Sequence, residues 1–156
     1  MSEGDLDAPN VKIIPPLVYL AGLVIGLLVS IWVPIKIVPS LLAWTLGGIL
    51  VVFGALLAGS AILKFKDAGT TVRPDRASRT LVIVGPYKIT RNPMYLGLAL
   101  VYAGISIADQ SVWTLILLPI VLTIIQRRAI ELEETFLEKR FGTDYLRYKE
   151  NIRRWI

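Results

Sequence analysis

A proline-marked turn near the middle of the chain carries residues that could bind an anion. The stretch GPYKITRNPMYLGLAL, residues 85–100, passes from the basic residues Lys88 and Arg91 directly into an apolar segment. Pro93 suits the first turn of a helix, where its missing N–H costs nothing, and Asn92 just before it suits the helix cap. The free N–H groups of a helix start attract anions. Together with Arg91, this turn predicts a site for a carboxylate or a phosphate.

A second polar cluster lies in the stretch RRAIELEETFLEKRFG, which begins at Arg127. We expect it to continue the helix of the preceding apolar segment. Arg127, Glu131 and Glu134 are spaced four and three residues apart, so they share one face of that helix. They could form an ordinary ion pair on a solvated helix or part of a site, and the spacing alone leaves both interpretations open.

The composition excludes several classes of chemistry. The chain of 156 residues contains no cysteine and no histidine, so it has no thiol nucleophile and no imidazole base or metal ligand. We therefore expect no metal site. The formal net charge of +5 does not indicate a nucleic-acid partner, because the basic residues stand next to long apolar runs. A membrane suits them better, since basic residues that flank apolar spans are held at anionic lipid.

Four apolar segments must position these polar clusters. Residues 13–33 and 38–63 each supply the roughly 20 apolar residues that a membrane-spanning helix needs. Residues 93–108 and 111–126 are shorter, and as helices of 16 residues they cover roughly 24 Å each. Only two residues separate the short segments, which predicts a tight helical hairpin. No segment contains an Asp, Glu, Lys or Arg, so we expect the chemistry at the membrane boundary.

The basic residues predict the topology. Of the 17 lysines and arginines, seven lie in residues 64–91 and eight in residues 127–154, hence on one side of the membrane. The positive-inside rule places both blocks in the cytoplasm, together with the N- and C-termini. We predict an all-α, multi-pass integral membrane protein with about four transmembrane helices plus cytoplasmic C-terminal helices. Residues 1–156 form one membrane domain, in which the loop 64–92 and the region 127–156 build the site.

The two polar clusters resemble a known family. GPYKITRNPMYLG and EETFLEKRFGTDYLRYKENIRR are similar to the isoprenylcysteine carboxyl methyltransferase family, part of a membrane superfamily that includes phospholipid methyltransferases. That family has Gly-Pro-Tyr, then Arg-His-Pro-x-Tyr-x-Gly, then Glu-Glu-x-x-Leu with aromatic and basic residues after it. The resemblance covers about residues 65–156. The family histidine is Asn92 in this chain, and asparagine can form hydrogen bonds but cannot carry a proton near neutral pH.

The resemblance implies transfer of a methyl group from S-adenosyl-L-methionine to a lipid-like acceptor at the cytoplasmic interface. The implied cofactor site consists of Tyr87, Arg91, Asn92, Tyr95, Gly97, Glu133 and Glu134. Glu133 and Glu134 would bind the ammonium group or the ribose hydroxyls of the cofactor, and Arg91 would bind its carboxylate. Tyr87 or Tyr95 would face its sulfonium. Gly97 would let the backbone approach the cofactor closely. The implied catalytic residues are Arg127, Arg128 and Glu134. The arginines would orient an anionic acceptor, and Glu131 or Glu134 would take a proton from an amine acceptor.

The identity of the acceptor stays open. The first interpretation is an activity like that of isoprenylcysteine carboxyl O-methyltransferases, because a carboxylate is already ionised and methyl transfer then needs alignment more than a base. A phospholipid or small-molecule N- or S-methyltransferase is the alternative within the superfamily. A non-catalytic membrane scaffold that binds lipid or a partner protein is the alternative of another class.

Overall fold

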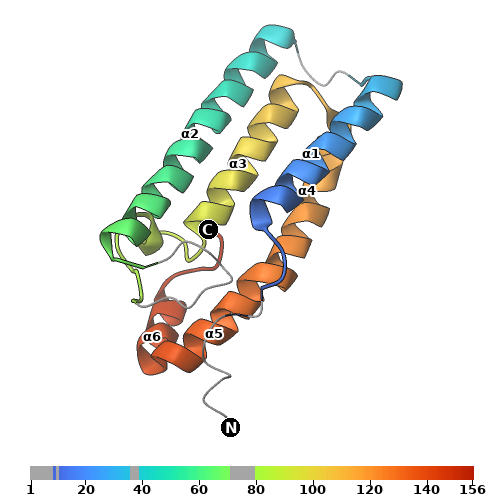
Figure 1. Ribbon diagram of the computed structural model, residues 1–156. Helices are drawn as coiled ribbons and strands as arrows, with labels where there is room; N and C mark the ends of the chain where they lie inside the picture. The colour runs from blue at the N-terminus through green and yellow to red at the C-terminus, as the bar shows by residue number, and fades with distance from the viewer. Residues whose placement is uncertain (1–8, 10, 36–38, 71–79) are drawn as a thin grey trace.

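The computed structural model describes residues 9, 11–35, 39–70 and 80–156, which form a bundle of helices (Figure 1). The chain runs through α1 (Pro15–Trp32), α2 (Ser40–Asp67), the short 3-10 helix η2 (Gly85–Lys88), α3 (Pro93–Ala108), α4 (Val112–Ile125), the π-helical turn η3 (Gln126–Ile130), α5 (Glu131–Phe141) and α6 (Thr143–Asn151). No strand occurs among the described residues. The prediction of an all-helical fold is confirmed.

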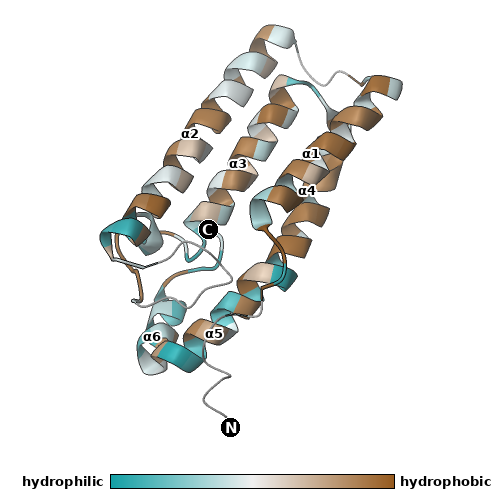
Figure 2. Cartoon of the chain, viewed as in Figure 1, coloured by the Kyte–Doolittle hydropathy of each residue, from teal (hydrophilic) through white to brown (hydrophobic). Residues whose placement is uncertain are grey.

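Among the described residues, two helices are long and apolar enough to cross a membrane. These are α1, with 18 residues, and α2, with 28, whereas α3 is a shorter apolar helix. Large apolar side chains such as Leu41 and Leu56 are exposed on the outside of the bundle, which is expected of a surface that faces lipid. Figure 2 shows that apolar residues dominate the bundle, whereas α5 and α6 are mostly hydrophilic. That all four helices span the membrane remains a prediction.

Helices α2 and α3 approach each other closely because glycines line their contact. A Cβ atom added at Gly54 would lie 2.6 Å from the carbonyl oxygen of Gly97, and one added at Gly47 would lie 2.5 Å from that of Gly104. Small residues of this kind let helices pack backbone to backbone in lipid. The close approach that Gly97 permits in the structure is therefore to α2. This differs from the expected approach to a cofactor, and we assign Gly97 to helix packing.

The glycine contact predicts an asymmetric response to alanine substitution in α2. Gly54→Ala forces a Cβ atom against the backbone of α3, and overpacking of this kind costs about 1–3 kcal/mol. Gly48→Ala is the matched control, because nothing lies within 4 Å of a Cβ atom there. Thermal unfolding in detergent should show a lower midpoint for Gly54→Ala and an unchanged or higher midpoint for Gly48→Ala. Equal midpoints for the two variants would contradict this account of the interface.

The predicted hairpin and the predicted helical extension are both present. The turn between α3 and α4 contains Asp109 and Gln110, and the hydroxyl of Ser111 caps α4 by accepting from the N–H of Thr114 at 3.3 Å. Helices α4, η3 and α5 follow one another without a break and carry the chain away from the apolar bundle (Figure 1). The π-helical turn η3 lies where the apolar part of this helix ends, and π-helical turns are frequent at functional sites.

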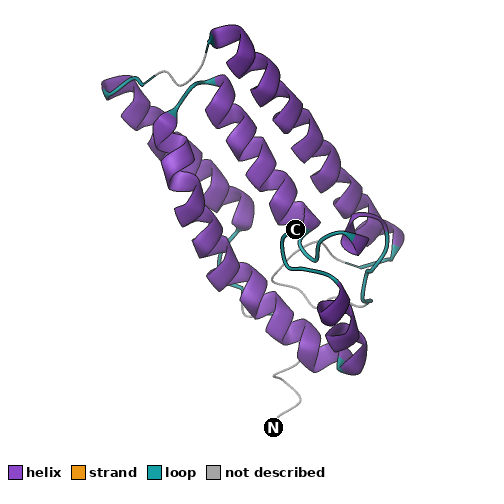
Figure 3. Cartoon of the chain, turned by 180° about the vertical axis from the view of Figure 1, so that it is seen from behind, coloured by secondary structure: helices purple, strands orange, loops and turns teal. Residues whose placement is uncertain are grey.

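The C-terminal segment, residues 152–156, folds back against the start of α3. Figures 1 and 3 show the C-terminus beside that end of α3 from both sides. The backbone N–H of Arg91 donates to the carbonyl oxygen of Arg153 at 3.0 Å. The hydroxyl of Thr90 donates to the carbonyl oxygen of Arg154 at 3.0 Å, and the side-chain amide of Asn92 donates to the same oxygen at 2.9 Å. These bonds join the C-terminal segment to the turn before α3.

Candidate functional site

A cavity of about 640 Å³, here called the larger cavity, lies among the residues before α1 and the helices α2, η2, α3, α5 and α6. Its volume is typical of cofactor pockets. Among its lining residues are Tyr87, Arg91, Asn92, Tyr95, Glu133 and Glu134, which are the expected cofactor residues apart from Gly97. They come from η2, from the turn before α3, from the first turn of α3 and from α5. The fold therefore brings the two polar clusters of the sequence together.

Glu134 is a buried carboxylate held by two arginines. Its side chain is 7% exposed, and Arg91 Nη1 lies 3.3 Å from its Oε1. Arg154 donates to it twice, from Nε to Oε1 at 3.1 Å and from Nη2 to Oε2 at 2.7 Å. This hydrogen bonding raises the pKa of Arg154, so its guanidinium stays charged. Both carboxylate oxygens of Glu134 therefore face cations, which hold this side chain in place.

Glu133 has a different environment from its neighbour. It accepts a hydrogen bond from the phenol of Tyr95, and no described residue forms an ion pair with it. Burial raises the pKa of Glu133 to about 7; the charge of Glu134 also raises it, and the Tyr95 hydrogen bond opposes both. Near neutral pH Glu133 is therefore present in both protonation states, and it can accept and release a proton.

Arg91 lines the larger cavity and has a buried guanidinium with unused hydrogen-bond donors. Its side chain is 9% exposed, and Nη1 pairs with Oε1 of Glu134 at 3.3 Å. Neither Nη1 nor Nε forms a hydrogen bond with a described residue. A buried donor without an acceptor is costly, and more so on a charged group. Arg91 can therefore bind an anionic group in the cavity, which fits the anion site predicted from the sequence.

Asn92 occupies the position expected of the cap of α3 but does not cap it with its side chain. The side-chain amide instead donates to the carbonyl oxygen of Arg154, and the backbone N–H of Asn92 donates to the hydroxyl of Thr90 at 3.2 Å. The amide is thus used to hold the C-terminal segment. Asn92 stands in the position of the family's histidine. In this chain its side chain bonds to the C-terminal segment, although the residue also lines the cavity.

Tyrosine rings enclose part of the larger cavity. Tyr148 donates from its phenol to the carbonyl oxygen of Tyr87 at 2.7 Å, and the ring of Tyr145 lies 6.0 Å from that of Tyr148. Burial raises the pKa of Tyr87, Tyr145 and Tyr148, so all three phenols are neutral. The faces of neutral aromatic rings attract cations such as a sulfonium or an ammonium.

The expected arginines lie apart from this cavity. Arg127 and Arg128 are exposed on η3, and neither lines the larger cavity. Glu131 pairs instead with Arg154 Nη1 at 3.5 Å and accepts a hydrogen bond from Gln126 at 3.2 Å. The common face expected for Arg127, Glu131 and Glu134 assumed a regular α-helix. The π-helical turn changes the hydrogen-bond spacing to i→i+5, so the face expected for an α-helix does not apply to this segment.

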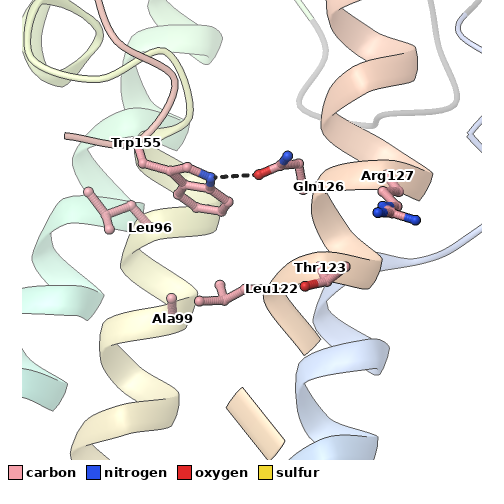
Figure 4. Close-up of a pocket in the computed structure, with 7 residues that line it drawn as sticks. All are labelled: Leu96, Ala99, Leu122, Thr123, Gln126, Arg127 and Trp155. Atoms are coloured by element: carbon pink, nitrogen blue, oxygen red, sulfur yellow. Dashed lines mark hydrogen bonds between the residues drawn. The ribbon is translucent and has the colours of Figure 1, made fainter. Parts of the chain in front are cut away.

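A second cavity, of about 450 Å³, lies on a different face of α3 (Figure 4). Leu96, Ala99, Leu122, Thr123, Gln126, Arg127 and Trp155 line it. The indole N–H of Trp155 donates to Oε1 of Gln126 at 3.1 Å. Successive residues of the C-terminal segment thus serve different cavities, since Arg154 binds Glu134 at the larger one and Trp155 lines the second.

A family model described as phospholipid methyltransferase matches residues 42–144 of the chain. The match includes the residues of α2, η2, α3 and α5 that line the larger cavity. This chain belongs to the phospholipid methyltransferase family. The phospholipid methyltransferases are members of the membrane superfamily that the motifs resemble, so that resemblance is confirmed, and membership implies methyltransferase activity.

Comparisons with curated proteins and with solved structures add no function to this assignment. A Haemophilus influenzae protein described as uncharacterized is 35% identical over 65 residues, which cover 40% of this chain and 100% of that protein. No solved structure matches the chain. The C-terminal segment with Arg154 and Trp155 lies outside the residues matched by the phospholipid methyltransferase model.

Proposed function

We propose that the protein transfers a methyl group from S-adenosyl-L-methionine to the amine of a phospholipid-like acceptor at the cytoplasmic membrane boundary. One observation carries this proposal. A protonatable carboxylate, an arginine with unused donors and a set of neutral tyrosines line the same cavity. Membership of the phospholipid methyltransferase family supports the reaction type, whereas the cofactor, the acceptor, the cytoplasmic side and the four-span topology are parts of the proposal.

The residues of the larger cavity fit the chemistry of this cofactor. Arg91 would bind its carboxylate through the unused donors. Glu134, fixed in place by Arg154, would accept from its ammonium or ribose hydroxyls. The neutral tyrosines would face its positive charge. When bound, S-adenosyl-L-methionine supplies an electrophilic methyl group on a sulfonium.

Glu133 is the residue suited to take the proton of an amine acceptor. Displacement at a methyl carbon forms the nitrogen–carbon bond as the carbon–sulfur bond breaks, so the amine must offer a free lone pair. The ammonium proton must pass to a base whose pKa lies near the working pH. Glu133 meets this condition, whereas Glu131 and Glu134 both pair with Arg154. We therefore place Glu133 in the role that the sequence analysis gave to Glu131 or Glu134.

A carboxylate acceptor, as in the isoprenylcysteine carboxyl methyltransferases, is the second candidate. Arg91 favours it, because unused donors on a buried arginine suit any carboxylate in the cavity. Such an acceptor has no proton to lose at neutral pH, so its rate would not follow the ionisation of Glu133. The two candidates therefore differ in pH dependence as well as in product.

A labelled-methyl assay tests the proposal directly. Protein in detergent should bind S-adenosyl-L-methionine in calorimetry and label phosphatidylethanolamine on nitrogen, with the product identified by mass spectrometry. A methyl ester on a prenylated cysteine, without labelled phospholipid, would instead select the second candidate. Absence of cofactor binding would contradict both candidates and favour the non-catalytic scaffold.

A further inference from the structure

The turn before α3 exposes several large apolar side chains. Ile83, Val84 and Ile89 are 45%, 48% and 70% exposed, whereas Tyr87 between them is buried and lines the larger cavity. Residues 83–89, here called the exposed turn, therefore have an inner side that belongs to the cavity and an outer side that is apolar. Single exposed apolar residues are ordinary, but a group so close together marks a contact surface.

Two contacts with α2 place the exposed turn at the end of the apolar part of that helix. Lys64 is the first charged residue of α2, and a Cβ atom added at Gly85 would lie 3.3 Å from its Cγ atom. The ring of Tyr87 lies 5.2 Å from the ring of Phe65, and η2 lies beside this end of α2 (Figure 1). Because charged residues mark the headgroup end of a helix that crosses a membrane, the exposed turn is expected at headgroup depth.

Basic residues of the exposed turn and of α2 suit an anionic surface. Lys66 and Lys88 are exposed, and within the described residues neither forms an ion pair. Lys64 instead pairs with Asp67 at 3.1 Å. Exposed apolar side chains together with unpaired lysines are typical of segments that lie in the interface of anionic membranes. A lipid surface therefore matches both the apolar and the charged residues of this part of the chain.

We propose that the exposed turn is a membrane-surface contact, which inserts its three apolar side chains among the headgroups of anionic lipids and binds their negative charge through Lys88. These lipids act as a surface and not as the methyl acceptor. The contact also steadies one wall of the larger cavity, because the carbonyl oxygen of Tyr87 accepts from Tyr148 and the turn leads directly into Arg91. Only the effect of this coupling on cofactor binding rests on the proposed function.

Single cysteines provide a test of the contact, because the chain contains no native cysteine. Ile89→Cys carries an environment-sensitive NBD fluorophore on the exposed turn. Leu56→Cys on α2 and Arg140→Cys on α5 replace exposed residues and are the references for hydrocarbon and for water. Each labelled protein is reconstituted into vesicles of phosphatidylcholine, alone or with phosphatidylglycerol. Lipids with a nitroxide on the headgroup or on the acyl chain, and aqueous iodide, are the quenchers.

The expected result is quenching of the label at position 89 by headgroup nitroxide in the anionic vesicles. Lys88→Gln, added to Ile89→Cys, should lower the equilibrium constant for insertion about fivefold there, the factor expected for one lysine near such a surface. Lys139→Gln, which removes an exposed charge of α5, should leave it unchanged. Ile83→Asp should reduce insertion in both kinds of vesicle.

Three outcomes would overturn the membrane contact. The first is that the labels at positions 89 and 140 respond alike to all quenchers, and the second is that Lys88→Gln and Lys139→Gln have equal effects. The third is a label at position 89 that neither lipid nor iodide quenches, which would indicate a protein partner in place of the membrane.

Calorimetry with S-adenosyl-L-methionine in the same vesicles tests the coupling to the larger cavity. Lys88→Gln should weaken cofactor binding by up to about fivefold in anionic vesicles and have no effect in detergent. Unchanged affinity in a variant that binds the cofactor would overturn the coupling alone. Lipid-dependent quenching in a protein that binds no cofactor would uphold the membrane contact and overturn the coupling, together with the proposed function.

Discussion

Glu133→Gln is expected to lower methyl transfer to an amine acceptor about 100-fold or more, the usual contribution of a general base. Glutamine keeps the size of the side chain and can still accept the hydrogen bond from Tyr95, but it cannot take up the proton. In the unsubstituted protein the rate should be half-maximal near pH 7, where Glu133 titrates, and should fall at lower pH. The variant should lose this pH dependence.

The control for this prediction is Glu138→Gln on the same helix. Glu138 pairs with Lys149 and does not line the larger cavity, so its removal should leave the rate nearly unchanged. If Glu133→Gln keeps the rate and pH profile of the unsubstituted protein, Glu133 is not the base. If the variant instead loses cofactor binding in calorimetry, Glu133 is a cofactor ligand.

The raised pKa of Glu133 also predicts a pH dependence of stability. The folded protein holds this proton up to about pH 7, whereas the ordinary value of a glutamate is 4.5. Between these values the folded state binds the proton more tightly than the unfolded state does, so this contribution to stability is lost as pH rises. The difference in melting temperature between Glu133→Gln and the unsubstituted protein should therefore move in favour of the variant from pH 4.5 to pH 7.

Arg154→Gln is expected to weaken S-adenosyl-L-methionine binding about tenfold or more and to lower the unfolding temperature. The substitution removes both hydrogen bonds to Glu134, and bonds to charged groups contribute about 1.5–3 kcal/mol. Glu134 would then be buried with Arg91 alone. Arg154→Lys restores the charge but not the paired geometry, so we expect an intermediate loss. Calorimetry and thermal unfolding in detergent measure the two effects.

Arg153→Gln is the matched control for Arg154. Arg153 is exposed, and it accepts the hydrogen bond from Arg91 with its backbone carbonyl oxygen, not with its side chain. The double variant Arg154→Gln, Glu134→Gln tests the pairing itself, because removing both charges should be less destabilising than removing one. Additive losses in the double variant, or equal effects of Arg153→Gln and Arg154→Gln, would contradict the role given to Arg154.

Local sequence signals were sufficient for much of the fold and of the larger cavity. Pro93 at a helix start, the two residues between the short apolar segments and the uncharged runs predicted where α3 and α4 begin and turn. The spaced motifs placed Arg91 and Glu133 near each other, and the structure places both in one cavity. These features depend on residues close to one another in the sequence.

The remaining features depend on contacts between distant residues. Nothing in the sequence near Arg154 indicates that its carbonyl oxygen accepts from Thr90 and Asn92, and this contact brings the guanidinium to Glu134. The π-helical turn η3 could not be predicted from the sequence pattern either, because helical periodicity assumes a constant number of residues per turn. The different environments of Glu133 and Glu134 follow from the first of these features, because Arg154 pairs with Glu134 and not with Glu133.

The seven-residue spacing shared by Gly47 and Gly54 in α2 and by Gly97 and Gly104 in α3 limits how this family can change in length. One inserted residue in α3 would rotate everything beyond it by about 100°. Side chains would then meet where two backbones now touch. We therefore expect relatives to keep the number of residues between Tyr95 and Gly104, so that insertions accumulate outside α3.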